Sequence, residues 1–160
     1  MGLDLLPRLC LCPEHCPRAH GVASGCTHLE NEPCPFAEDD FPIGILASCC
    51  SYRGKALAYE LRALQQNELA EKTYEDMDAE EAEDFAHELR EAANRLETEH
   101  KGKPSSPVGA TWSNVQSSQE NGCQIVDVPS TFEEAIAEIR RGARWYEKVA
   151  SLGFGVHAWY

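Results

Sequence analysis

The residues of this sequence that could do chemistry are concentrated between positions 10 and 34, in the stretch CLCPEHCPRAHGVASGCTHLENEPC. This stretch holds five of the eight cysteines of the chain, together with His15, His20 and His28. Cysteine thiolate and histidine imidazole are the usual ligands of structural zinc in proteins. An iron–sulfur cluster, disulfides or buried free thiols would use the same residues, so composition alone leaves these alternatives open.

The spacing favours a zinc site whose ligands are Cys12, Cys16, Cys26 and Cys34, although a histidine could replace one of them. Three residues separate Cys12 from Cys16, as in many zinc loops, whereas the seven residues between Cys26 and Cys34 make a longer loop. Each of the four cysteines lies close to a proline or a glycine, which lets the chain wrap around a tetrahedral centre. Because four protein ligands leave no open position for water, we expect one zinc ion with a structural role.

Residues 13–44 need a source of order, because they are rich in Pro, Gly, Cys and His and show neither a helical nor a strand period. Ordering the backbone costs roughly 1–2 kcal/mol per residue. Structural zinc can supply on the order of 10 kcal/mol of apparent binding free energy at neutral pH. We therefore expect the metal, added to packing against the core, to hold this segment.

The composition limits the partners and the compartment of the chain. Its formal net charge is −13 without a local basic stripe, so nucleic acid is not expected to bind, and another protein is the expected partner. A run of about 18 apolar residues, which a membrane span requires, is not present. The first residues also lack the pattern of a secretory signal. We therefore expect a cytoplasmic protein, in whose reducing surroundings clustered cysteines favour metal binding.

The order of the expected elements predicts an α+β fold, with three main helices packed on a small antiparallel sheet and an irregular Cys/His-rich segment near the N-terminus. A chain of 160 residues has the length of a single domain. Within residues 1–160 we distinguish a loop module at 10–44, a helical part at 45–100, a linker at 101–109 and, at 110–160, a hairpin, a helix and a C-terminal strand.

The first two helices are predicted from apolar residues at helical spacing. The first lies within 48–66, with Ser48 as its N-cap. The second covers 79–100 and opens with Asp78 and Glu81 in the pattern of a capping box. Its expected apolar face consists of Ala82, Phe85, Ala86, Leu89, Ala93 and Leu96.

The third helix is predicted at 131–152. Ser130 and Glu133 form the pattern of another capping box, and Gly153 is placed to end the helix in a left-handed conformation. Its apolar face is expected to contain Phe132, Ile136, Ile139, Ala143, Tyr146 and Ala150, widened by Trp145, Val149 and Leu152.

Two pairs of strands are predicted. ATWSNVQ and CQIVDVP flank SSQENG and form a β-hairpin, because Val, Ile, Thr and Trp favour strands and Asn-Gly marks a turn. The segments GLDLL and FGVHAWY, near the two ends, are expected to pair with each other, since an isolated strand would leave its backbone groups unpaired. Pro7 follows the first of them and is tolerated in an edge strand.

A second candidate site lies in ASCCSYRGK, residues 47–55. If the first helix starts after Ser48, then Cys49 and Cys50 lie in its first turn, where the helix dipole favours a thiolate. Arg53 could then bind an anionic substrate. The spacing does not match the phosphatase pattern of cysteine, five residues and arginine, and a buried pair of thiols or further metal ligands are the alternatives.

Three segments resemble, in their order, a loose group of small uncharacterised phage and prophage proteins: MGLD at 1–4, CSYRGKALAYEL at 50–61 and FEEAIAEIRRGARWYEKVASLGFGVHAWY at the end of the chain. In that group a short N-terminal strand is followed by a variable region, and a helix with a short tail comes last. The resemblance covers about half of the chain, and the Cys/His segment departs from it. It implies no activity for any residue.

Two functions are compatible with these patterns. The first is a protein-binding or regulatory module, because the sequence has no Gly-rich phosphate loop, no HExxH motif and no carboxylates at a catalytic spacing. The second is a cysteine-dependent enzyme, in which Cys49 or Cys50 is the nucleophile and Arg53 binds an anionic substrate.

Overall fold

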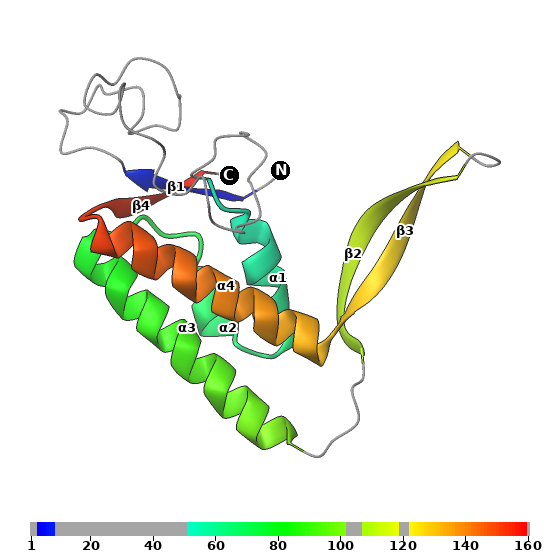
Figure 1. Cartoon of the computed structure of the whole chain (residues 1–160), viewed down its shortest axis with the longest axis horizontal. Coiled ribbons are helices and arrows are strands. Elements are labelled where there is room, and N and C mark those ends of the chain that lie inside the picture. The colour runs from blue at the N-terminus through cyan, green and yellow to red at the C-terminus, as the bar shows by residue number, and fades with distance from the viewer. Residues whose placement is uncertain (1–2, 9–50, 102–106, 119–121, 160) are drawn as a thin grey trace.

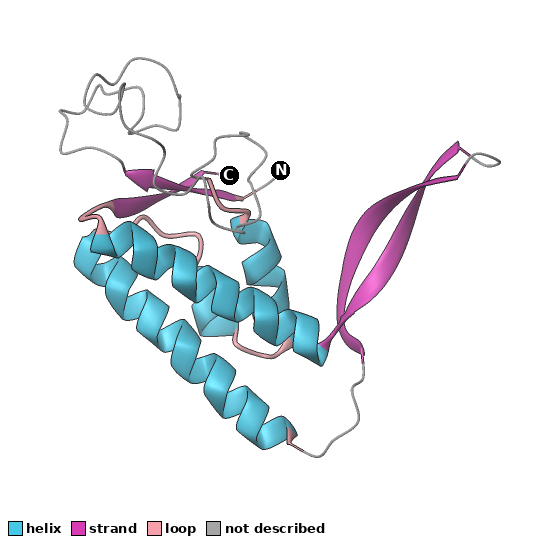
Figure 2. Cartoon of the chain, viewed as in Figure 1, coloured by secondary structure: helices cyan, strands magenta, loops and turns pink. Residues whose placement is uncertain are grey.

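The computed structural model describes residues 3–8, 51–101, 107–118 and 122–159. These residues form an α+β fold, as predicted, although their strands pair as two separate two-stranded antiparallel sheets rather than one (Figure 1). Figure 2 shows helices and strands in separate colours. In chain order the elements are β1 (Asp4–Arg8), α1 (Gly54–Ala63), α2 (Asn67–Lys72), α3 (Ala79–His100), β2 (Pro107–Ser118), β3 (Gly122–Thr131), α4 (Phe132–Ser151) and β4 (Gly155–Trp159).

Helix α3 forms as the sequence predicts. The Asp78 carboxylate accepts the Glu81 backbone N–H, and the Glu81 carboxylate accepts the Asp78 N–H, so the capping box is confirmed. The predicted apolar face is buried against α4, which lies alongside α3 (Figure 1). Its fully or nearly fully buried members are Ala82, Phe85, Ala86, Leu89 and Ala93, and Leu96 packs against the same core at its edge.

Helix α4 begins one residue later than predicted. Its capping box uses Thr131 and Glu134, because the Ser130 hydroxyl donates to the buried Glu60 carboxylate and is not available to the helix. The predicted apolar face is confirmed except at Leu152, which is 38% exposed beyond the last turn. Gly153 follows with a φ of 73°, the left-handed conformation predicted for it.

Helix α1 begins at Gly54, so the predicted start after Ser48 is wrong. Residues 51–53 are not helical, because Tyr52 pairs with Leu5 of β1 through two backbone hydrogen bonds of 2.9 Å. These long-range hydrogen bonds outweigh the local preference of the segment for a helix. From Gly54 onward the helix packs its leucine stripe into the core, with Leu57 and Leu61 fully buried.

The predicted pairing of the two chain ends is confirmed, since β1 and β4 form an antiparallel pair along all five residues of each strand. Pro7 lies opposite Val156, whose backbone N–H and C=O are both bonded to Met77 on the other side, at 2.8 and 2.9 Å. The missing N–H of Pro7 therefore leaves no hydrogen bond of β4 unmade.

Strands β2 and β3 form the predicted hairpin, as a long antiparallel ribbon that projects from the helical part of the molecule (Figure 1). The two strands pair from Thr111 opposite Pro129 to Ser118 opposite Gly122, with an irregularity before Thr111. The ribbon connects α3 to α4, so it interrupts the sequence but not the packing of these two helices.

An aromatic cluster lies at the centre of the core. Trp145 contacts Tyr52 and Tyr146 with ring centroids 5.5 and 5.2 Å apart, and Phe85 meets Tyr146 edge to face at 4.8 Å. Except for the buried Glu60 and Glu138, the charged residues of the four helices are exposed or partly exposed. Among the described residues, no helix combines the length and the apolar character that crossing a bilayer requires.

Candidate partner-binding groove

Six cysteines have a role in the predictions, and all of them lie outside the described residues: the zinc ligands Cys12, Cys16, Cys26 and Cys34, and the candidate nucleophiles Cys49 and Cys50. Within the described ranges, no group of three or more His, Cys, Asp or Glu side chains is arranged to hold a metal ion. The zinc site therefore stays a prediction from composition and spacing.

The start of α1 differs from the anion site that the sequence predicts. Because the helix begins at Gly54, the two candidate nucleophiles do not lie in its first turn. Its first N–H groups already have acceptors: Gly54 donates to the Tyr52 carbonyl at 2.9 Å and Lys55 donates to the Leu3 carbonyl at 3.1 Å. Arg53 directly precedes the helix, but these backbone donors are not available to a substrate.

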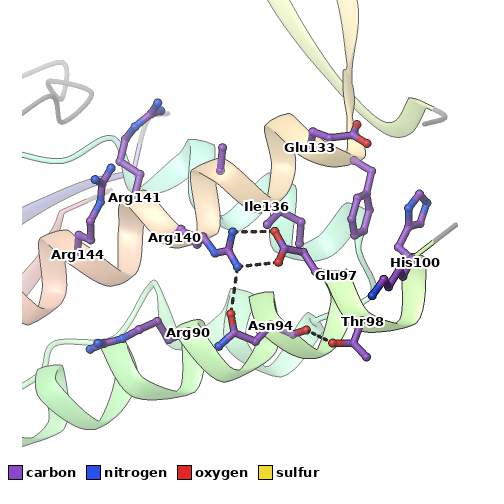
Figure 3. Close-up of a pocket in the computed structure, with 13 residues that line it drawn as sticks. Arg90, Asn94, Glu97, Thr98, His100, Glu133, Ile136, Arg140, Arg141 and Arg144 are labelled. Atoms are coloured by element: carbon purple, nitrogen blue, oxygen red, sulfur yellow. Dashed lines mark hydrogen bonds and ion pairs between the residues drawn. The ribbon is translucent and has the colours of Figure 1, made fainter. Parts of the chain in front are cut away.

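An open groove of about 980 Å³ lies between the second half of α3 and the first two thirds of α4 (Figure 3). Of the thirteen residues that line it, five are arginine or lysine and two are glutamate. The whole chain has 14 basic and 27 acidic residues, so the groove locally reverses the charge of the molecule. Its basic lining residues are Arg90, Lys101, Arg140, Arg141 and Arg144.

Ion pairs across the two helices position part of this lining. Arg140 of α4 donates from both terminal nitrogens to the Glu97 carboxylate of α3, at 2.7 Å each, and also donates to the Asn94 amide oxygen at 3.1 Å (Figure 3). Arg90 of α3 lies 2.9 Å from the Glu147 carboxylate of α4. These bridges join α3 to α4, and the Arg140–Glu97 pair shows that a carboxylate fits a guanidinium group of the groove in a two-pronged geometry.

Arg141 and Arg144 extend from α4 away from Glu97 and form the rim of the groove (Figure 3). Arg144 is exposed and, in the part of the chain that the structure describes, has no acidic partner within ion-pair distance. Arg141 donates to the Glu138 carboxylate at 2.7 Å, and a third of its side chain is exposed. An incoming carboxylate would therefore meet Arg144 directly, but would compete with Glu138 for Arg141.

The far end of the groove is aromatic. The rings of His100 and Phe132 are stacked, with centroids 3.8 Å apart and an angle of 10° between their planes. Phe132 and Ile136 are buried beneath this end and give it an apolar floor. The groove thus offers charged contacts along its length and an apolar contact at one end.

Comparison with protein-family models, with curated proteins and with solved structures finds no match to this chain.

A buried polar cluster lies behind Arg141. The Tyr52 hydroxyl donates a hydrogen bond to the Glu138 carboxylate at 2.5 Å. Nearby, the Glu60 carboxylate of α1 accepts a hydrogen bond from the Ser130 hydroxyl. Burial raises the pKa of Glu138 above its ordinary value, and the charge of Glu60 adds to the rise, whereas Tyr52 and Arg141 oppose it. Burial, followed by the charge of Glu138, raises the pKa of Tyr52 well above its ordinary value.

The predictions from sequence did not include this groove. One signal for it was present, because RRGAR at 140–144 places three arginines within five residues of an acidic chain. The contribution of Arg90 and Lys101 from α3 could be seen only after the two helices were packed together.

Proposed function

We propose that this protein is a protein-binding or regulatory module, and that the groove between α3 and α4 takes an acidic segment of its partner. The observation that supports the proposal is the gathering of five of the 14 basic residues in one groove of a chain whose net charge is −13. Arginine recognises carboxylates through paired hydrogen bonds, as Arg140 already does with Glu97. Arg144 offers the same group without an internal competitor among the described residues.

The charge distribution favours a short acidic protein segment over a nucleic acid. Charges on a protein surface interact over a Debye length of about 8 Å at physiological ionic strength. A short segment held in the groove is therefore influenced mainly by the arginines, whereas a long polyanion would extend over the acidic exterior and be repelled by it. This partner differs from the basic protein surface that the net charge alone would favour.

The test is the binding of a labelled hexa-aspartate peptide, measured by fluorescence anisotropy. Arg144→Gln should weaken binding about three- to fivefold, the value of one exposed ion pair, and added salt should weaken it further. Arg95→Gln is the matched control, because Arg95 lies on α3 outside the groove, where it donates to Gln66. Equal effects of the two substitutions, or tighter binding of an oligonucleotide than of the peptide, would overturn the proposal.

A structural zinc ion, bound by Cys12, Cys16, Cys26 and Cys34, is the second part of the proposed module. Its support is the supply and spacing of thiols in a segment that lacks an apolar period. Metal analysis of the purified chain should give about one zinc per chain, and chelation should loosen residues 10–34 while α3 and α4 persist. A purified chain without stoichiometric metal would contradict this part.

A cysteine-dependent enzyme stays the alternative function. It would use Cys49 or Cys50 as the nucleophile. Because α1 begins at Gly54, the helix N-terminus no longer supports a thiolate at these positions. Single alanine substitutions of these cysteines that abolish a measurable turnover without unfolding the chain would favour it over the binding module. The cytoplasmic location and the relation to phage proteins also stay predictions.

A further inference from the structure

Arg141 connects the groove to the buried polar cluster. Its side chain lines the groove at the rim, and its Nη1 donates to the Glu138 Oε2 at 2.7 Å. The other carboxylate oxygen of Glu138 accepts a hydrogen bond of 2.5 Å from the Tyr52 hydroxyl. The Nε of Arg141 is buried and has no hydrogen-bond partner within the described residues, so the guanidinium is held mainly by Glu138.

Glu138 is held between opposing influences. The titratable and charged groups that act on it are Tyr52 ahead of α1, Glu60 on α1 and Arg141 one turn further along α4. Burial and Glu60 favour the neutral carboxyl group, whereas, among the described residues, Tyr52 and Arg141 favour the carboxylate. If Arg141 turns to another anion, Glu138 loses one of the two groups that keep it charged.

We propose that Glu138 regulates the groove through Arg141. The charged carboxylate keeps Arg141 in their internal ion pair, and protonation of Glu138 makes the guanidinium available to the acidic segment. This inference rests on the proposed function of the groove. Linkage makes the effect reciprocal, so binding of the segment draws a proton onto Glu138 by the same factor by which the proton strengthens binding. The groove therefore binds its partner more tightly as the pH falls.

The experiment measures the affinity of the hexa-aspartate peptide between about pH 5.5 and 8, where its aspartates, with an ordinary pKa of about 3.9, stay charged. All variants carry His100→Gln, so that the described lining of the groove contains no imidazole. On this background, affinity should rise about three- to fivefold as the pH falls, the value of one added ion pair. Adding Glu138→Gln should give the high affinity at every pH.

Glu97→Gln is the matched control, because it also frees an arginine, Arg140, but does not alter Glu138. It should raise affinity and keep the pH dependence. A flat profile with Glu138 intact, or an unchanged pH dependence in Glu138→Gln, would overturn the inference and leave the binding function standing.

A titration of the uncomplexed protein by NMR keeps the test independent of how well the variants fold. The side-chain Nε–H signal of Arg141 should shift with the same midpoint as the carboxyl carbon of Glu138. Independent midpoints would overturn the inference. If the two signals titrate together but no peptide binds at any pH, the proposed function fails, and with it the regulation of binding, while the coupling of the two side chains stands.

Discussion

Removing the hydroxyl from either of two tyrosines in the aromatic core is the same chemical change, but we expect opposite effects on the free energy of unfolding. Tyr52 and Tyr146 are both fully buried, and both rings contact Trp145. The Tyr52 hydroxyl donates to Glu138 at 2.5 Å, whereas the Tyr146 hydroxyl has no hydrogen-bond partner within the described residues. Replacing either residue by phenylalanine removes the hydroxyl and keeps the ring, so the two variants separate hydrogen bonding from packing.

The structure sets the expected magnitudes. Tyr52→Phe should lower the free energy of unfolding by about 2 kcal/mol, because hydrogen bonds to charged groups contribute about 1.5–3 kcal/mol. In a domain of this size that corresponds to a fall in Tm of about 4–8 °C. Tyr146→Phe should leave the free energy unchanged or raise it by up to about 1 kcal/mol, because a buried hydroxyl without a partner is destabilising.

Urea unfolding followed by tryptophan fluorescence gives both values, provided that the denaturant dependence of the free energy stays the same in the two variants. A thermal melt of each variant supplies an independent comparison. Equal losses in Tyr52→Phe and Tyr146→Phe would mean that the hydroxyl of Tyr52 contributes no more than that of Tyr146. The assignment of a stabilising hydrogen bond to Glu138 would then be refuted.

Three further predictions concern the chain end and the buried acid. Gly155→Ala should cost about 2 kcal/mol or more, measured by urea unfolding, because an added Cβ would collide with the Met77 backbone carbonyl. Deleting residues 154–160 should destabilise the whole domain, since the fully buried Val156 is lost, and an unchanged melting curve would contradict this. Because the pKa of Glu138 is raised in the folded state, the folded protein keeps this proton to higher pH than the unfolded chain does. The free energy of unfolding should therefore fall as the pH rises from the unfolded-state pKa of Glu138 to its folded-state pKa. Glu138→Gln should remove this fall from urea midpoints measured over a series of pH values.

The sequence predicted those elements whose signals are local. The capping box of α3 was correct because Asp78 and Glu81 find their partners in each other. The box of α4 was misplaced by one residue because Ser130 bonds to Glu60, whose position 70 residues earlier is invisible to a local pattern. The start of α1 was wrong for the same reason, since pairing with β1 captures the segment before it.

The groove was harder to predict than the fold. Its arginines on α4 stand together in the sequence, but a groove also needs the neighbouring face of α3, and the spacing of residues does not say which exposed faces meet. The residue types that could do chemistry, mainly the cysteines, lie elsewhere in the sequence. Charged residues on helices are usually solvated, so their arrangement acquires meaning only after the helices are packed.

The pairing of β1 with β4 has a consequence for biosynthesis. Leu5 is synthesised 153 residues before its cross-strand partner Ala158, so the ribosome must deliver almost the whole domain before this sheet can close. Until then the apolar β1 has no strand to cover it, whereas α3 can already form from its own capping box. Contacts between residues so distant in sequence form slowly, because a long loop must first be closed. The nascent chain should therefore close this sheet only after β4 has been synthesised, and β1 is the segment that a chaperone would protect in the meantime.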